Sequence, residues 1–291
     1  MTATLHEDAT TTVIPGAAQL VRVRTKGYYK DIGTGAKYTS VTTILDRNVA
    51  KHLQHWAGNM VARCAMDNLP YLVKSSRNAD ERIDAYEWLK KAHERKKNER
   101  GDIGSAIHSL IEARILGTPL APEVAENPEF LPYLRCFDDF VREWKVEFTA
   151  SEMIVANATH GYGGTLDTLL RSVLIAEELG VNPDLDIAED TKTGGELDVK
   201  GVYPEAALQM SAYAHAEFAQ TRAGRRVVMP PVADRGVVLH LRPEGYRLIP
   251  MEIGAPTFEQ FLALVRLDRG WTRGLSKQVV GSALNLPTRG E

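Results

Sequence analysis

Asp190 and Lys192 place a carboxylate and an amine two residues apart in the segment IAEDTKTG, which reads as a strand leaving a hydrophobic core. Successive side chains of a strand point to opposite faces, so these two share one face, about 6–7 Å apart along the backbone. In that arrangement the carboxylate could hold a divalent metal ion while the amine contacts a phosphate beside it. A D-x-K pattern arises often by chance and usually lies on a solvated surface strand, so the pair needs support from other residues.

Three further segments carry side chains that suit such a site. Asp167 lies among leucines in GYGGTLDTLL, where its charge would cost free energy unless a metal ion offset it. Gln209 and Tyr213 lie four residues apart on one face of a helix that begins at Pro204. His108 lies on an earlier apolar-periodic helix, RGDIGSAIHSLIE. The ordinary alternatives are a helix-face histidine and a tyrosine that packs in the core.

The order of these segments resembles a known family. A helical His, then G-x-x-D, D-x-K-T-G and Q-x-x-x-Y are similar to the PD-(D/E)XK nuclease superfamily, specifically its RecB-like branch. The resemblance covers roughly residues 100–218, and YTSVTTIL at 38–45 looks like the opening segment of phage-encoded members. The span between the two acids is longer than usual, because of an insert at about 172–186 whose AEELG could form a short helix. The family implies an α/β fold: a restriction-endonuclease-like core, with a mixed central sheet flanked by helices, and here a helical N-terminal half.

The resemblance also implies a metal site. Asp167 and Asp190 would offer carboxylate oxygens to Mg²⁺ or Mn²⁺, and the backbone carbonyl of Thr191 would be a third ligand. His108 would add a nitrogen ligand, which suits Mn²⁺ better than Mg²⁺. Asp167 and Asp190 are therefore expected to be both metal-binding and catalytic.

The remaining catalytic roles fall on Lys192, Gln209 and Tyr213. Lys192 would orient the attacking water or place its charge against the transition state, and the resemblance does not decide which. Gln209 and Tyr213 would hold the phosphate or position Lys192 through hydrogen bonds. Glu152 could reach the metal, but Glu152 and Glu189 are expected to be surface acids.

Composition sets the broad class. With 291 residues and 44% hydrophobic content, the chain can form one large domain or a core with a helical appendage. No run approaches the roughly 18 apolar residues of a membrane span, and the N-terminus lacks the order of a signal peptide, so we expect a cytoplasmic protein with no membrane partner. Cys64 and Cys136 are too few for the four-thiolate iron–sulfur cluster that some relatives carry. We expect both to be buried free thiols.

DNA is the expected partner even though the net charge is −3. Basic residues gather in three places, where they could follow a phosphate backbone or could equally be solvated helix faces: Arg95, Lys96, Lys97 and Arg100; Arg222, Arg225 and Arg226; and Arg266, Arg269 and Arg273. The chain has no G-x-x-x-x-G-K-[ST] motif, so any unwinding would come from a helicase or recombination partner.

The periodicity divides the chain into four regions, and the resemblance implies that the third is the nuclease core: a disordered tail at 1–16, a hairpin and helical region at 17–99, the core at 100–275, and a C-terminal tail at 276–291. The hairpin is expected at 20–39 and helices fill 40–117. Core strands are expected at 148–156, 164–171, 186–193, 236–242 and 246–250, and helices at 130–144, 204–221 and 257–273.

Together these features favour a divalent-metal-dependent deoxyribonuclease that hydrolyses phosphodiester bonds, specifically an exonuclease of phage or bacterial recombination and repair. The alternatives are a DNA-end-binding module that does not cleave, and a structure- or sequence-specific endonuclease of the same fold. The large helical half led us to expect a channel over the metal site, which would admit only a DNA end.

Overall fold

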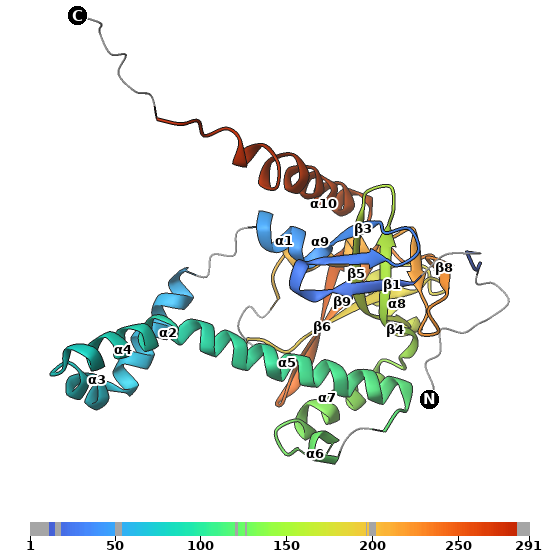
Figure 1. The fold of residues 1–291 in the computed structure, drawn as a ribbon. Coiled ribbons are helices and arrows are strands. Elements are labelled where there is room, and N and C mark those ends of the chain that lie inside the picture. The colour runs from blue at the N-terminus through green and yellow to red at the C-terminus, as the bar shows by residue number, and fades with distance from the viewer. Residues whose placement is uncertain are drawn as a thin grey trace, which may run out of the picture.

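The computed structural model describes residues 12–14, 19–49, 54–119, 122–125, 127–195, 197 and 202–283. In this part of the chain, helices are concentrated in the first half, and all ten named strands join one curled, mixed sheet (Figure 1). The predicted mixed α/β class and the helical N-terminal half are confirmed. None of the described helices is both long and apolar enough to cross a membrane.

The sheet follows a path of seven strands with a three-strand branch. The path runs β1 (Leu20–Val23), β2 (Tyr28–Asp31), β3 (Lys37–Ser40), β5 (Tyr162–Arg171), β4 (Glu147–Asn157), β7 (Phe218–Gln220) and β8 (Arg226–Val228). The branch leaves β5 through antiparallel β6 (Ile187–Lys192), which pairs in parallel with β9 (Arg235–Arg242), and β9 pairs with antiparallel β10 (Gly245–Glu252). The predicted hairpin is therefore part of a three-strand meander, and its last strand joins the core in parallel with β5.

The two ends of the strand path meet through side chains. The amide of Gln220 on β7 pairs with the backbone of Leu20 on β1, accepting from its N–H at 2.6 Å and donating to its carbonyl at 3.1 Å. Arg226 on β8 forms a buried ion pair with Asp31 on β2 at 2.9 Å. These contacts explain the curl, because they tie the first two strands of the path to its last two.

The N-terminal tail is only partly described. Of the 16 residues predicted to be disordered, 12–14 lie against β8, where Val13 forms an antiparallel bridge with Val227. The prediction is wrong for these three residues, because the exposed edge of β8 offers backbone groups to pair with. The rest of that tail and residues 284–291 of the predicted C-terminal tail lie outside the described residues.

Helices cover both faces of the sheet. On β6, Ile187 belongs to the hydrophobic cluster beneath α5 (Ala92–Leu116), α7 (Leu131–Glu143) and α8 (Val173–Leu179). The next residue, Ala188, belongs to the cluster beneath α1 (Val41–Asn48), α9 (Glu205–Ala214) and α10 (Ala255–Leu267). Because neighbouring side chains of a strand point in opposite directions, the two clusters lie on opposite faces.

One group of helices stands away from the sheet. The helices α2 (Gln54–Asp67), α3 (Leu69–Ser75) and α4 (Ala79–Lys90) pack on one another and beside the first turns of α5 (Figure 1). We call residues 54–100 the helical lobe. The second half of α5 continues onto the sheet, next to α7 and the short α6 (Pro122–Ala125).

Two of the predicted helices end earlier in the structure than expected. The helix expected at 204–221 ends at Ala214, because residues 218–220 pair with β4 as strand β7. The helix expected at 257–273 ends as α10 at Leu267, and residues 268–272 form a π-helical turn. The short helix expected in the insert is present as α8.

Both cysteines are free, as expected, but neither is buried. Cys64 is half-buried on α2 and accepts a weak hydrogen bond from Arg95 at 3.7 Å. Cys136 is half-buried on α7, with its thiol 3.8 Å from the carbonyl of Pro243.

Candidate functional site

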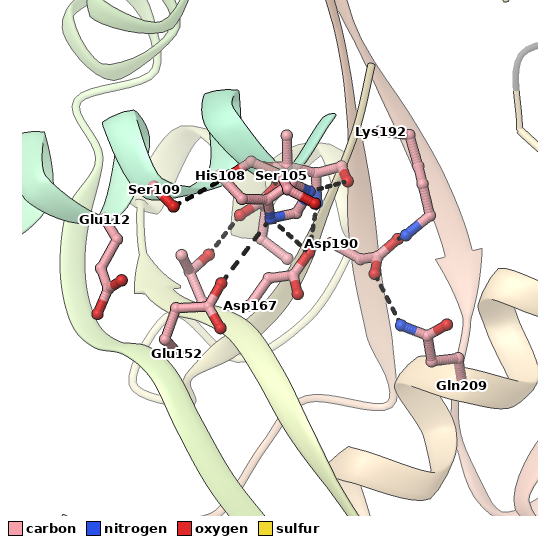
Figure 2. A network of polar contacts seen from close by, with 12 residues as sticks. Ser105, His108, Ser109, Glu112, Glu152, Asp167, Asp190, Lys192 and Gln209 are labelled. Carbon is pink, nitrogen blue, oxygen red and sulfur yellow. Dashed lines mark hydrogen bonds and ion pairs between the residues drawn. The ribbon is translucent and has the colours of Figure 1, made fainter. Parts of the chain in front are cut away.

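Most of the predicted site residues lie together where α5 crosses β5 and β6 (Figure 2). The helix is anchored there by Ile107, Leu110 and Ile111, which are buried in the cluster shared with α7. His108 follows Ile107 on the helix and is half-buried, with its ring over the two strands. The apolar face of α5 therefore fixes the position of the histidine.

A backbone carbonyl determines which nitrogen of His108 faces the acids. The Nε2 atom lies 3.1 Å from the carbonyl oxygen of Thr191, which can only accept, so Nε2 carries a proton and donates. The Nδ1 atom faces Asp167 Oδ2 at 3.7 Å and Glu152 Oε1 at 3.8 Å. Metal-binding histidines commonly use one nitrogen as the ligand while the other donates to a carbonyl.

The carboxylates raise the pKa of His108. Burial alone would lower it, but the contact with Glu152 and the negative charge of Asp167 outweigh burial and raise the pKa to about 9. Without a cation the ring is therefore an imidazolium at neutral pH. A divalent cation at Nδ1 would replace that proton and meet the same two carboxylates.

Glu152 reaches the site because its backbone is unusual. Its φ angle is +49°, in the left-handed region that non-glycine residues rarely adopt, and it lies between the cross-strand pairs Ser151–Thr168 and Met153–Leu166. The expectation of a surface acid is wrong for Glu152, because this irregularity in β4 turns its side chain toward His108 (Figure 2). Such a conformation costs about 1–2 kcal/mol, and at a functional site that cost is often retained.

Asp167 completes a group that could hold a metal ion. Its Oδ2 accepts from the Thr191 N–H at 3.1 Å, which links β5 to β6 beside the histidine. One ligand atom each from His108, Glu152 and Asp167 lie within 4.8 Å of one another. The set has one nitrogen and two carboxylate oxygens, which fits a cation such as Mn²⁺.

Asp190 and Lys192 form a second group on the opposite face of β6. As predicted, their side chains share a face, and they form an ion pair. Asp190 is almost fully buried, and its other oxygen accepts from Gln209 Nε2 on α9 at 3.1 Å (Figure 2). Thr191 connects the two groups. It lies between Asp190 and Lys192 in the chain, and its backbone contacts His108 and Asp167.

Burial and neighbouring charges shift the pKa values of both members of the ion pair. Burial raises the pKa of Asp190, and the charge of Lys192 opposes that effect. Burial would lower the pKa of Lys192, but the charges of Asp190 and Asp167 outweigh it, so this pKa is raised. Lys192 therefore keeps its positive charge at neutral pH.

Glu189 is buried, and the prediction of a surface acid is wrong. Its carboxyl group lies on the α5 face of β6 and accepts from the hydroxyls of Thr168 and Thr191. Burial raises its pKa to about 7. The sequence gives no sign of this, because the burial comes from the neighbouring strands and α5.

Tyr213 lies one turn beyond Gln209 on α9 and is buried in the core beneath the sheet. A β-carbon at Gly164 on β5 would lie only 2.1 Å from the ring of Tyr213, so the glycine makes room for the tyrosine. Packing accounts for this position, and a contact of Tyr213 with phosphate stays a prediction.

The predicted basic clusters do not all face the site. Arg226 is buried in its pair with Asp31, and Arg273 pairs with the buried Asp268, so both have structural roles. Arg222 pairs with Glu112 on α5. Arg95, Lys96, Lys97 and Arg100 lie on the part of α5 that precedes His108, as expected.

No protein-family model matches the sequence, and no curated protein is similar to it. Among solved structures, that of SSO0001 aligns with 60% of this chain and 68% of its own chain, at 11% identity and a TM-score of 0.28. A likeness at this TM-score carries no argument about fold or function.

Proposed function

We propose that this protein is a divalent-metal-dependent DNA nuclease of the RecB-like branch of the PD-(D/E)XK superfamily, built on a restriction-endonuclease-like core. One observation carries the proposal: His108, Glu152 and Asp167 each bring one ligand atom to within 4.8 Å of the others, beside the ion pair of Lys192 with the buried Asp190. The sequence motif includes four of these five residues, and Glu152 is the exception. An acid–lysine pair next to a potential metal site can supply charge that stabilises the transition state of phosphodiester hydrolysis.

The chain's own groups would bind the cation and charge the site. His108 Nδ1, Glu152 and Asp167 would hold Mn²⁺ or Mg²⁺. Asp190 and the Thr191 carbonyl stay proposed as further ligands, but here Asp190 contacts Lys192 and Gln209, and the carbonyl accepts from His108 Nε2. When bound, the cation would lower the pKa of a water molecule and offset negative charge on the phosphate. The half-buried carboxylates of Glu152 and Asp167 favour this binding, because a positive charge relieves their mutual repulsion.

Lys192 would act as a fixed positive charge. Its raised pKa argues against a role as a general base and favours electrostatic stabilisation of the negatively charged transition state. Gln209 holds Asp190 from α9, so Asp190 stays directed at Lys192. Gln209 is therefore a positioning residue for the ion pair, and a substrate phosphate would compete with Asp190 for the lysine.

Within this class we propose an exonuclease of phage or bacterial recombination and repair, working in the cytoplasm with DNA and, for unwinding, with a helicase partner. This finer assignment depends on the resemblance of the sequence motifs. The two alternatives predict different products: a DNA-end-binding module leaves DNA intact, and an endonuclease cuts closed circles.

The test uses end-labelled linear DNA with Mn²⁺, with Mg²⁺ and with a chelator. We expect metal-dependent release of short products from the wild type and none from Asp167→Asn. The matched control is Asp184→Asn, an exposed acid outside the site. Intact DNA with both metals would reject the nuclease and favour the end-binding module.

A further inference from the structure

Three side chains form an aromatic–arginine cluster on the helical lobe, away from the candidate site. Tyr71 on α3 and Trp88 on α4 meet edge to face, with ring centroids 5.7 Å apart. The guanidinium of Arg95 on α5 lies 4.7 Å from the centroid of Trp88 and also donates to the Trp88 carbonyl at 2.6 Å. The cluster thus joins the three helices at one point.

The helical lobe has almost no interior to explain this arrangement. Among its described residues only Ser75, Ala85 and Ala92 are buried. Tyr71 is 46% exposed, and Arg95 is exposed as well. An aromatic ring held at the surface between neighbouring groups keeps a face available for a planar ligand, and covering it would be favourable.

The helical lobe also carries a net positive charge, although the net charge of the whole chain is negative. Residues 54–100 contain ten Lys or Arg and seven Asp or Glu, a surplus of three positive charges, whereas the whole chain carries −3. The rest of the chain is therefore at −6. A positive surface with exposed aromatic rings fits a ligand that has both negative charges and flat apolar faces.

We propose that the aromatic–arginine cluster binds single-stranded nucleic acid, with a base stacked on Tyr71 and the adjoining phosphates near the basic side chains of the lobe. Bases stack on aromatic rings and on guanidinium planes without much regard to sequence, while positive groups follow the backbone. Exposed aliphatic side chains on the lobe, such as Met66 and Ile83, would suit a protein partner instead. The positive surplus and the Tyr71–Trp88–Arg95 arrangement favour nucleic acid.

The cluster has a defined distance from the candidate site, and this part of the inference rests on the proposed nuclease function. Arg95 and His108 are thirteen residues apart on α5, which corresponds to about 20 Å along the helix at about 1.5 Å per residue. At about 3.4 Å per stacked nucleotide this distance spans about six nucleotides, and fewer if the strand is stretched. Lys97 and Arg100 are exposed between the two points. The cluster would therefore hold a strand several nucleotides from the bond that is cut.

The experiment measures stacking separately from charge and from cleavage. Fluorescence anisotropy, with chelator present so that no DNA is cut, compares an oligo-dT of about 16 nucleotides with an abasic strand that has the same number of phosphates. We expect the wild type to bind oligo-dT about tenfold more tightly than the abasic strand. Tyr71→Leu, which keeps apolar bulk without a ring, should bring the ratio close to one, and Tyr71→Phe should preserve it.

Tyr86→Leu and Ile83→Ala are the matched controls. Both residues are exposed on α4, at 62% and 60%, and among the described residues neither has a ring, cation–π or hydrogen-bond contact with the cluster, so both variants should keep the tenfold preference. Equal binding of the two strands by the wild type would overturn the proposal, as would an equal loss in Tyr86→Leu. If Tyr71→Leu changes the sedimentation of the protein from dimer to monomer without changing the ratio, the surface serves self-association and the proposal is wrong. Cleavage assays with Mn²⁺ report on the nuclease separately, so either proposal can fail alone.

Discussion

Lys192 and Asp190 are paired in the structure, but a substrate phosphate would need the same positive charge. Replacing Lys192 by Ala should therefore lower the rate of DNA cleavage by a hundredfold or more, as expected when a charge that stabilises the transition state is lost. Single-turnover cleavage with saturating Mn²⁺ measures this effect. Lys277→Ala, at an exposed lysine near the C-terminus, is the control. Full activity of Lys192→Ala, with an unchanged circular dichroism spectrum, would end this mechanism.

Two substitutions of Glu152 separate its expected role as a metal ligand from the energetic cost of its backbone conformation. Glu152→Gln removes one charged ligand while keeping the shape, and should weaken Mn²⁺ binding at least tenfold in titration calorimetry. Glu152→Gly removes the same ligand but also relieves the left-handed backbone at +49°, and should raise the free energy of unfolding by about 1 kcal/mol. Unchanged Mn²⁺ affinity in Glu152→Gln would show that Glu152 is not a ligand.

His108→Ala tests the same cation from the helix side. It should weaken Mn²⁺ binding, and a higher Mn²⁺ concentration should restore part of the cleavage, because one ligand among several is lost. Asp167→Asn, in contrast, should not be rescued, since it removes a charge as well as a ligand. Identical Mn²⁺ affinities of the wild type and His108→Ala would remove the histidine from the site.

The sequence singles out four residues of the candidate site, and the structure adds the contacts that each one makes. Strand alternation places Asp190 and Lys192 on one face, whereas His108 and Asp167 stand out only because the order of the motifs resembles a known nuclease family. Glu152 could not be found from the sequence, because its place depends on the sign of one backbone angle. Glu189 looks like any acid beside Asp190 until the strands on both sides bury it.

At the scale of the elements, the ion pair of Asp31 on β2 with Arg226 on β8 should make the stability of the fold depend on pH. The direction of that dependence follows from the pKa of Asp31. Burial alone would raise the pKa of Asp31, but hydrogen bonds from the Thr34 backbone and Arg226 outweigh it, so the pKa is lowered. A lowered folded-state pKa adds stability above the unfolded-state pKa of about 4, and this stability is lost as the pH falls through the folded-state value.

Asp31→Asn should therefore cost about 3 kcal/mol of unfolding free energy near pH 7. The difference from the wild type should shrink as the pH falls below about 4. Urea unfolding at several pH values measures it, with the exposed Asp184→Asn as control. A difference that grows in acid would contradict the assigned direction.

The helix α5 contains two glycines that differ in their surroundings. A β-carbon at Gly101 would meet no atom within 4 Å, whereas one at Gly104 would lie 3.3 Å from Thr193 Oγ1. Gly101→Ala should stabilise the helix by about 1 kcal/mol, and Gly104→Ala should gain less because Thr193 must shift. Thermal unfolding followed by circular dichroism compares them, and a larger gain at Gly104 would show that the contact is not tight.

The elements were easier to predict than their ends. The short strand β7 was expected to be helical, because PEAALQMSAYAHAEFAQ keeps apolar residues at helical spacing throughout. Pairing with β4 and β8 overrides that local preference at 218–220. Pairings between distant strands, such as β3 with β5, leave no local mark in the sequence.

For the whole molecule, the position of the helical lobe changes the expected substrate. The lobe lies beside the first half of α5 and not over the sheet (Figure 1), so it does not form the closed channel that we predicted. A strand that reaches from the aromatic–arginine cluster to His108 must instead be unpaired over about 20 Å. Duplex DNA offers such a stretch at frayed ends.

We therefore expect linear duplex DNA to be degraded from its frayed ends, and both closed circular single-stranded DNA and relaxed closed circular duplex to resist, as the proposed exonuclease requires. Increasing salt should slow all cleavage steeply, since phosphate contacts bring the strand to the site. Gel assays of the three substrates at matched nucleotide concentration measure this. If either closed circle is cut at the rate of the linear duplex, a free end is not required, and the protein is an endonuclease.

The side-chain contacts that close the sheet join residues far apart in the sequence, so they can form only late in translation. Leu20 finds Gln220 only after 200 further residues have been translated, which takes about 10–40 s at the usual 5–20 residues per second. Until then β1 and β2 exist without the residues that tie them to β7 and β8, and their open edge is free to pair with other chains. We therefore expect a nascent chain of this protein to expose that edge until most of its residues have been translated.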